Sequence, residues 1–266
     1  MTIHAVIVPL DFSPGALRAV LPAGAIARRF GARVLPVTSR FGWDDKDPAS
    51  ELAALTQTIG AVTDPPRVYD RFAPNAISEL AHTTRDSIVC MATQGREGLA
   101  RLTGSVAEDV LCRVRAPVVL IGPSSIADPT ADTGPVLICV DGSSVANAIV
   151  PIVIEWLRGT CQVAQFVRVA RPDEDEDADA AGVPLSGIAV GLPADIAERV
   201  SWTVLQHDEA APAIVEFARR EQAPLIAMAT HGRTGLRRIV VGSVTTRVVH
   251  DASCPILTVR PAALHD

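Results

Sequence analysis

Aromatic residues, paired cysteines and long apolar runs are scarce in this sequence. Only 4% of the residues are aromatic, and the five cysteines are odd in number and form no Cys-x-x-Cys pair, which favours buried thiols over disulfides or metal ligands. No segment approaches the roughly 20 apolar residues of a membrane helix, and no basic region precedes the first apolar run. A net charge of −6 and a pI near 5.5 lack the basic excess of nucleic-acid-binding proteins. We therefore expect a cytoplasmic protein that contacts neither membrane nor nucleic acid.

Catalytic and metal-binding motifs are also missing from the sequence. It contains no Gly-x-Ser-x-Gly elbow, no phosphate loop with a lysine and no histidines at metal-ligand spacing. The acidic run at 173–179 lacks the glycine and the terminal glutamate of a calcium-binding loop, so a solvated loop is the better interpretation. These observations predict a protein that is not an enzyme and holds no metal site of its own.

The most informative feature is a repeat. The segment 91–99, Met-Ala-Thr-Gln-Gly-Arg-Glu-Gly-Leu, returns at 228–236 as Met-Ala-Thr-His-Gly-Arg-Thr-Gly-Leu, and Gly-Ser-Val follows each copy at 104–106 and 242–244. Each half also opens on an apolar run that ends in Asp and Ser, at 5–13 and 136–143. Half of the 266 residues is a typical domain length. The repeat therefore predicts two domains, 1–122 and 135–266, joined by a linker at 123–134 that is rich in proline, serine and aspartate.

Apolar runs that alternate with helical segments predict an α/β fold in each half. Runs such as Val118–Ile121 and Ile256–Val259 are typical of parallel strands buried on both faces, and the intervening helices are expected to cover both faces of the sheet. Pro22 is expected to kink or divide the first helix, and Pro36 predicts a bulge in the second strand. The late glycine-bearing loop, followed by a serine-capped helix, is how a backbone holds a phosphate group.

The order of these features resembles the universal stress protein family in its tandem form. The resemblance covers nearly the whole chain and implies two Rossmann-like domains of the adenine nucleotide alpha hydrolase-like type, each a five-stranded parallel sheet in the order 3-2-1-4-5. ATP-binding members of the family carry Gly-x-x-Gly, nine residues, and then Gly-Ser or Gly-Thr. The resemblance also implies that the last strands of the two halves pair as a pseudo-dimer, and it leaves a homodimer open.

Both halves depart from the family's nucleotide motif. The second half has Ala229 where the family has its first glycine, then His231, Gly232, Arg233 and, after nine residues, Gly242, Ser243 and Val244. The first half has Ala92 and Gly95 with only eight residues before Gly104 and Ser105. A shortened loop changes the direction of every later amide, so the second half is the better candidate for ATP binding. Mg²⁺ would bind together with the phosphates of ATP. An alanine in place of glycine is expected to be strained if its φ is positive.

The resemblance further implies that Asp11 and Asp141 lie beside the nucleoside and Val37 beside the adenine. The alternative is that each aspartate only caps the adjoining turn. The leading hypothesis is a non-catalytic, ATP-binding stress-response regulator. Two other readings remain open at this point, an interaction module that binds no nucleotide and a slow ATPase.

Overall fold

The computed structural model describes residues 3–40, 52, 59–93, 106–172, 191–230 and 241–261. The first half contains β1 (Ala5–Pro9), α1 (Pro14–Leu17), α2 (Val20–Phe30), β2 (Arg33–Ser39), β3 (Arg67–Tyr69), α4 (Ala73–Thr83), β4 (Ser87–Ala92), α5 (Val106–Arg113) and β5 (Val118–Ile121). The second half contains β6 (Val136–Cys139), the 3₁₀ helix η1 (Ala146–Ile149), α6 (Val150–Gly159), β7 (Ala164–Ala170), α8 (Ala194–Ala197), β8 (Val200–Gln206), α9 (Ala210–Arg220), β9 (Ile226–Ala229), α10 (Ser243–Asp251) and β10 (Ile256–Val259).

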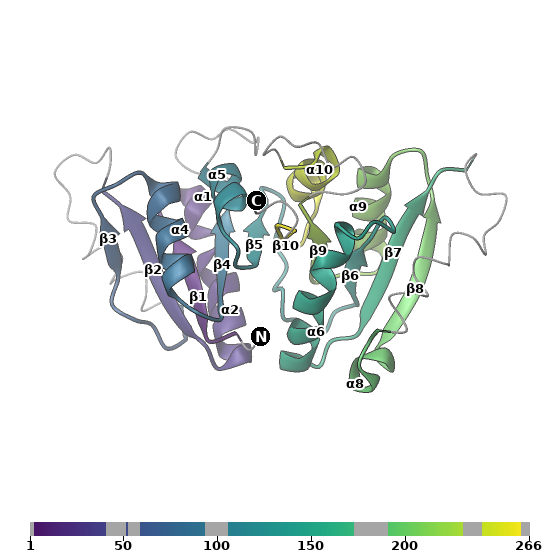
Figure 1. The fold of residues 1–266 in the computed structure, drawn as a ribbon, viewed down its shortest axis with the longest axis horizontal. Helices are drawn as coiled ribbons and strands as arrows, with labels where there is room; N and C mark the ends of the chain where they lie inside the picture. The colour runs from purple at the N-terminus through teal and green to yellow at the C-terminus, as the bar shows by residue number, and fades with distance from the viewer. Residues whose placement is uncertain are drawn as a thin grey trace.

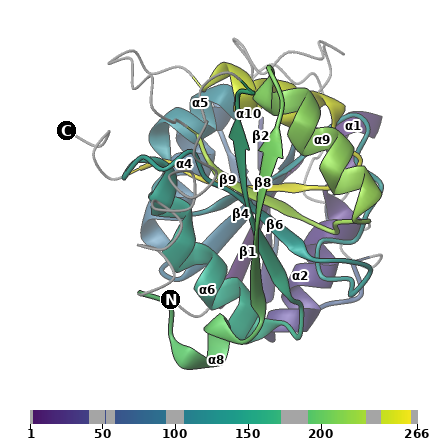
Figure 2. The same ribbon diagram turned by 90° about the vertical axis from the view of Figure 1, so that its right-hand side faces the viewer.

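All these strands form one ten-stranded sheet in the order β3-β2-β1-β4-β5-β10-β9-β6-β7-β8. Within each half the strands are parallel and follow the order 3-2-1-4-5, which confirms the predicted fold class. The halves meet where β10 runs antiparallel to β5, with Leu257 opposite Val119. The two halves lie side by side with helices in front of and behind the sheet (Figure 1). The view turned by 90° shows how strongly the strands twist along the sheet (Figure 2).

Two buried apolar clusters cover the two faces of the sheet, because successive residues of a strand point to opposite sides. In β1, Val6 and Val8 belong to the cluster that includes Ile26 of α2 and Trp156 of α6. Ala5 and Ile7 belong to the other cluster, which includes residues of α4 and α9. Each cluster therefore contains side chains from both halves.

The prolines affect the fold as follows. The first helix is divided into α1 and α2, with Pro22 in the first turn of α2, where its missing amide removes no intrahelical hydrogen bond. The bulge expected at Pro36 is wrong, because the register between β1 and β2 runs unbroken from Ala5 opposite Arg33 to Pro9 opposite Val37. Pro36 is tolerated because pairing of β2 with β3 begins only at the next residue.

Segment 123–134 connects the halves without a helix or strand and is fixed to both. Arg18 of the first half donates hydrogen bonds to the carbonyls of Pro123 and Ser125. In the second half, Gln162 Nε2 donates to the carbonyls of Pro129 and Ala131, at 3.1 and 2.7 Å. The rings of Phe30 and Trp156 add a direct contact, with their centroids 5.2 Å apart.

Candidate functional site

The carboxyl ends of β6 and β9 form one edge of the second half. The register places Cys139 beside Met228, so Asp141 and Thr230, each two residues further along, leave the sheet at the same edge. Strand order reverses between these strands, since β7 lies on one side of β6 and β9 on the other. Ligands of open α/β sheets bind at such a switch point. In the first half the equivalent edge is formed by β1 and β4.

Asp141 closes a tight turn at this edge. Its Oδ1 accepts hydrogen bonds from the Ser143 amide at 2.9 Å and the Ser143 hydroxyl at 2.6 Å, and Ser143 Oγ accepts from the amide of Ala146 at 3.1 Å. Asp11 of the first half makes the same turn with Ser13, at 3.0 and 2.6 Å. The turn role, one of the two readings left open by the sequence, is thus present in both halves, and it holds each carboxylate at the end of its strand.

The residue after the aspartate differs between the halves. Gly142 has φ +82°, whereas its counterpart Phe12 has φ +59°. Glycine adopts this left-handed region readily, but a bulky side chain there is strained by about 1–2 kcal/mol. Phe12 packs its partly buried ring against the core cluster on its side of the sheet. The first half therefore presents an aromatic side chain where the second half presents bare backbone.

The start of α10 lies against the end of β9. The Gly242 amide donates to the carbonyl of Thr230 at 2.9 Å, and Thr245 Oγ1 donates to the carbonyl of Ala229 at 3.3 Å. Gly242 is the N-cap residue at φ −58°, so its position does not require a positive φ. The serine cap expected for this helix is wrong: Ser243 is the first helical residue, and no side chain caps the helix. Thr230 and Thr245, which fix α10 to β9, were missed by the sequence reasoning.

The first three amides of α10 have no hydrogen-bond acceptor among the described residues. Within the described part of the chain, the amides of Ser243, Val244 and Thr245 donate no hydrogen bond to another residue, and the first backbone bond of the helix runs from Thr246 to Gly242. Such amides, together with the helix dipole, favour an anion at the helix start. Ser243 is exposed, so this end of the helix is open to solvent.

The two alanines that replace the family's first glycine are not strained. Ala229 ends β9 and Ala92 ends β4. The non-glycine residues with positive φ in the described ranges are Phe12, Asp86 and Gln222, so neither alanine adopts that conformation. The strain considered for Ala229 therefore does not arise. The alanine adds only a methyl group at this position, and Ala229 is buried, with 6% of its surface exposed.

The first turns of the two equivalent helices carry different charges. The first turn of α5 holds Glu108 and Asp109, whereas the first turn of α10 holds no acidic residue. At the matching positions α10 has Thr246 and Arg247, and Arg247 pairs with Glu209 at 2.7 Å. Carboxylates at a helix start satisfy the dipole themselves and repel a phosphate. The difference is visible in the sequence.

Several predicted site residues cannot be placed. His231, Gly232, Arg233, Gly95, Gly104 and Ser105 lie outside the described residues. Val37, expected beside an adenine, has a side chain only 1% exposed that packs within the core. Across the ranges that the structure describes, no group of three His, Cys, Asp or Glu residues could hold a metal ion, and no helix is both long and apolar enough to cross a membrane.

Comparison with known proteins agrees with this duplicated architecture. The sequence model of the Universal stress protein family matches the chain twice, over residues 2–122 and 133–260. The chain belongs to the universal stress protein family. It carries two copies of the family's domain in tandem.

Individual universal stress proteins resemble the chain to different extents. One from Mycobacterium tuberculosis is 26% identical over 183 residues, which are 65% of this chain and 61% of that protein. The chain thus spans about three-fifths of the length of this relative. A crystal structure from Archaeoglobus fulgidus covers 97% of the chain and 96% of its own length at 19% identity, with a TM-score of 0.66, and shares the fold. A universal stress protein solved in complex with cAMP is 27% identical over 46% of this chain and 98% of its own, with a TM-score of 0.39.

Proposed function

We propose that this universal stress protein is a non-catalytic regulator that binds ATP through its second half, and that nucleotide occupancy sets its conformation or choice of partner. The proposal rests on the start of α10, where three amides have no partner in the described chain and the first turn contains no acidic residue. Asp141, fixed at the neighbouring strand end, is proposed to contact the nucleoside, and Mg²⁺ would arrive with the phosphates. Loop residues His231, Gly232 and Arg233 are proposed to complete the cradle.

In this proposal the first half does not bind nucleotide. Phe12 takes the place of Gly142, the first turn of α5 carries Glu108 and Asp109, and the loop is one residue shorter. These three differences act in the same direction. Phe12 replaces bare backbone at the strand end, Glu108 and Asp109 add negative charge at the helix start, and the shorter loop redirects the later amides. The first half is proposed instead as a structural and interaction domain, with the pairing of β5 and β10 supporting a pseudo-dimer within one chain.

The test uses Gly242, whose backbone at φ −58° and ψ 146° accepts any side chain. Aspartate is a favourable N-cap residue, so Gly242→Asp should fold at least as stably as the parent chain while its carboxylate occupies the position of a phosphate. Gly242→Asn is the matched control, since it has the same shape and capping ability without the charge. We expect calorimetric titration with ATP to show that Asp raises the Kd at least about tenfold above the value for Asn.

Two further results would complete this test. Gly104→Asp, the same change in the first half, should leave the affinity and the stoichiometry of ATP unchanged. If Gly242→Asp binds ATP as tightly as the parent chain, the phosphates do not lie at α10 and the proposal is wrong. Release of ADP over hours by the parent chain would favour the slow ATPase instead.

A further inference from the structure

A cavity of about 590 Å³ opens on the molecular face that carries α4, α5 and α6. It is lined by the turn after α4, by the turn after α5 and by Ile152 of α6, so both halves contribute to it. It is open to solvent over much of its extent, so a ligand bound in it would stay partly exposed. Neither Asp141 nor any residue at the start of α10 lines it, so it is separate from the nucleotide site proposed above.

The repeat explains why this cavity is open. The second half has two equivalent turns, which follow α9 and α10. Segment 123–134 contacts both of them. Thr133 Oγ1 donates to the carbonyl of Gln222 at 2.9 Å, and the amide of Ile126 donates to the carbonyl of Ser253 at 2.9 Å. Gly134 lies so close to this surface that a Cβ atom on it would stand 2.1 Å from the Glu221 carbonyl oxygen. One connecting segment covers one of two equivalent surfaces, and the cavity lies on the other.

The charges of the open surface differ from those of its covered counterpart. Alignment of the repeats places Arg85 opposite Gln222 and Arg115 opposite Ser253. Both arginines are exposed and line the cavity, and neither guanidinium forms a hydrogen bond or ion pair with another residue in the described ranges. His82 also lines the cavity, and Asp86 is its acidic residue. Two permanent positive charges against one negative charge favour an anionic occupant.

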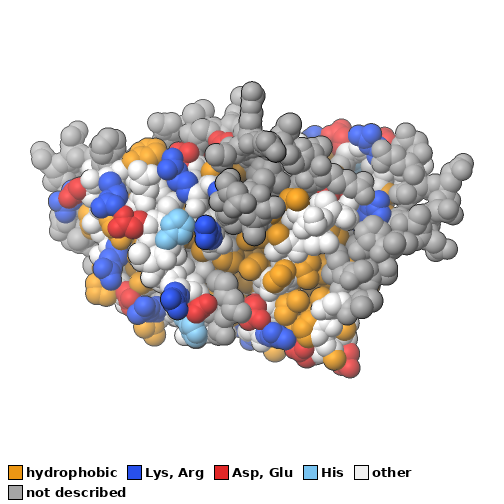
Figure 3. Space-filling view, viewed as in Figure 1, with side chains coloured by type: hydrophobic (Ala, Val, Ile, Leu, Met, Phe, Trp, Pro, Cys, Tyr) orange, Lys and Arg blue, Asp and Glu red, His pale blue; other side chains and the backbone are white. Residues whose placement is uncertain are grey.

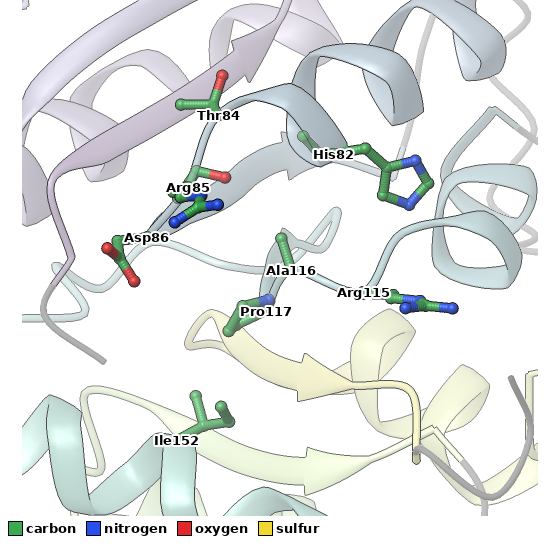
Figure 4. Close-up of a pocket in the computed structure, with 10 residues that line it drawn as sticks. His82, Thr84, Arg85, Asp86, Arg115, Ala116, Pro117 and Ile152 are labelled. Atoms are coloured by element: carbon green, nitrogen blue, oxygen red, sulfur yellow. The ribbon is translucent and has the colours of Figure 1, made fainter.

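The close-up shows how these groups are arranged (Figure 4). Arg115 and His82 lie at one end of the cavity, Arg85 and Asp86 at the other, and Ala116 and Pro117 lie between them, with Ile152 across from these two on α6. The space-filling view shows a hollowed, largely apolar surface beside a group of basic side chains on this face (Figure 3). The middle of the cavity is therefore apolar, and its charged groups are at the rim.

One buried polar atom also belongs to this cavity. Ser87, at the start of β4, is 1% exposed and lines the cavity, and its Oγ has no hydrogen-bond partner. An unsatisfied buried hydroxyl costs about 1–3 kcal/mol. A polar occupant of the cavity would remove this penalty if the hydroxyl rotated toward it, since serine rotamers interconvert readily.

We propose that this cavity is a second binding site, which takes a small organic anion with an apolar body. The anionic group is held by Arg115 or Arg85 at the rim, and the apolar body lies on Ala116, Pro117 and Ile152. Because Ile152 belongs to the second half and the other lining residues to the first, a bound anion holds the halves together on the face that segment 123–134 does not cover.

The experiment uses a matched pair of fluorescent probes on the full chain. Anilinonaphthalene sulfonate has an apolar body with one anionic group, and N-phenylnaphthylamine is the same body without that group. Both are titrated in the presence of excess ATP, so that a dye molecule at the nucleotide site cannot account for the signal. We expect the sulfonate to bind more tightly than the neutral probe.

Substitutions of the lining residues test whether the sulfonate binds in this cavity. Arg115→Gln and Arg85→Gln together should raise the Kd of the sulfonate at least about tenfold and leave the neutral probe unchanged, since only the charged contact is removed. Arg29→Gln and Arg219→Gln together, at exposed arginines of α2 and α9 that do not line the cavity, are the control for net charge and should change neither Kd. Ile152→Asp should weaken both probes. Unchanged sulfonate binding in the double arginine variant would overturn the proposal.

Discussion

A single negative charge in the first turn of α10 should weaken ATP binding in this universal stress protein. Thr246→Glu copies into the second half the charge that Glu108 gives to α5. Thr246 is three residues after Ser243, about 5 Å along the helix axis, so a phosphate held by the first amides would lie roughly 8 Å from the new carboxylate.

The size of the effect follows from Coulomb's law. Two unit charges 8 Å apart interact by about 0.5 kcal/mol in water, and physiological salt reduces this to about 0.2 kcal/mol. A triphosphate carries several charges, and the protein side of the site screens them less than water does. The total repulsion between the phosphates and the new carboxylate is therefore about 1 kcal/mol, which corresponds to roughly a fivefold rise in the Kd of ATP.

Calorimetric titration of Thr246→Glu against Thr246→Gln measures this difference, because the two variants have the same size and differ by one charge. The difference should shrink as the salt concentration rises, since the two charges are near the surface. Equal Kd values for the two variants, in a chain that does bind ATP, would refute the placement of the phosphates at α10.

Three further predictions concern stability. Gly122→Ala should lower the free energy of unfolding by about 1–3 kcal/mol, measured in urea, because a Cβ atom there would stand 2.0 Å from the Val249 carbonyl oxygen of α10; an unchanged value would mean that α10 can move away freely. Gly142→Ala should lower it by about 1 kcal/mol, since φ there is +82°, and an increase would contradict this backbone. Burial raises the pKa of Cys139 and of Cys254 to about 12, so the unfolded chain loses these thiol protons first. Stability should therefore be unaffected by these thiols below about pH 8 and fall by up to about 1.4 kcal/mol per pH unit per thiol above about pH 9; Cys139→Ala should reduce that slope, and a flat profile up to pH 10 would contradict the burial.

Much of the fold could be predicted because its signals are local. The strands Val118–Ile121 and Ile256–Val259 have the predicted bounds, since a short apolar run between turns is typical of a strand buried on both faces. The division of the first helix near Pro22 also followed from local sterics. The bulge at Pro36 was wrong because its effect depends on where the neighbouring strand β3 begins, which the sequence of β2 does not contain.

The candidate site was less predictable. The repeat pointed to the ends of β6 and β9, which the structure places at one edge of the sheet, and the turn made by Asp141 was one of two hypotheses left open. Ser243 does not cap α10, and Phe12 has a positive φ. Both features depend on how the chain enters and leaves each strand, and the spacing of apolar residues carries no information on this. The cavity beside Arg115 was out of reach, because it exists only where a distant segment covers one copy of a repeated surface and leaves the other open.

The central claim is that phosphate is held by the first amides of α10, and amide NMR measures it directly. With ¹⁵N-labelled full chain, addition of ATP should shift the amide resonances of Ser243, Val244 and Thr245 strongly and leave those of Val106 to Glu108 at the start of α5 unchanged. Shifts confined to α5, or none at either helix with ATP in millimolar excess, would contradict the account.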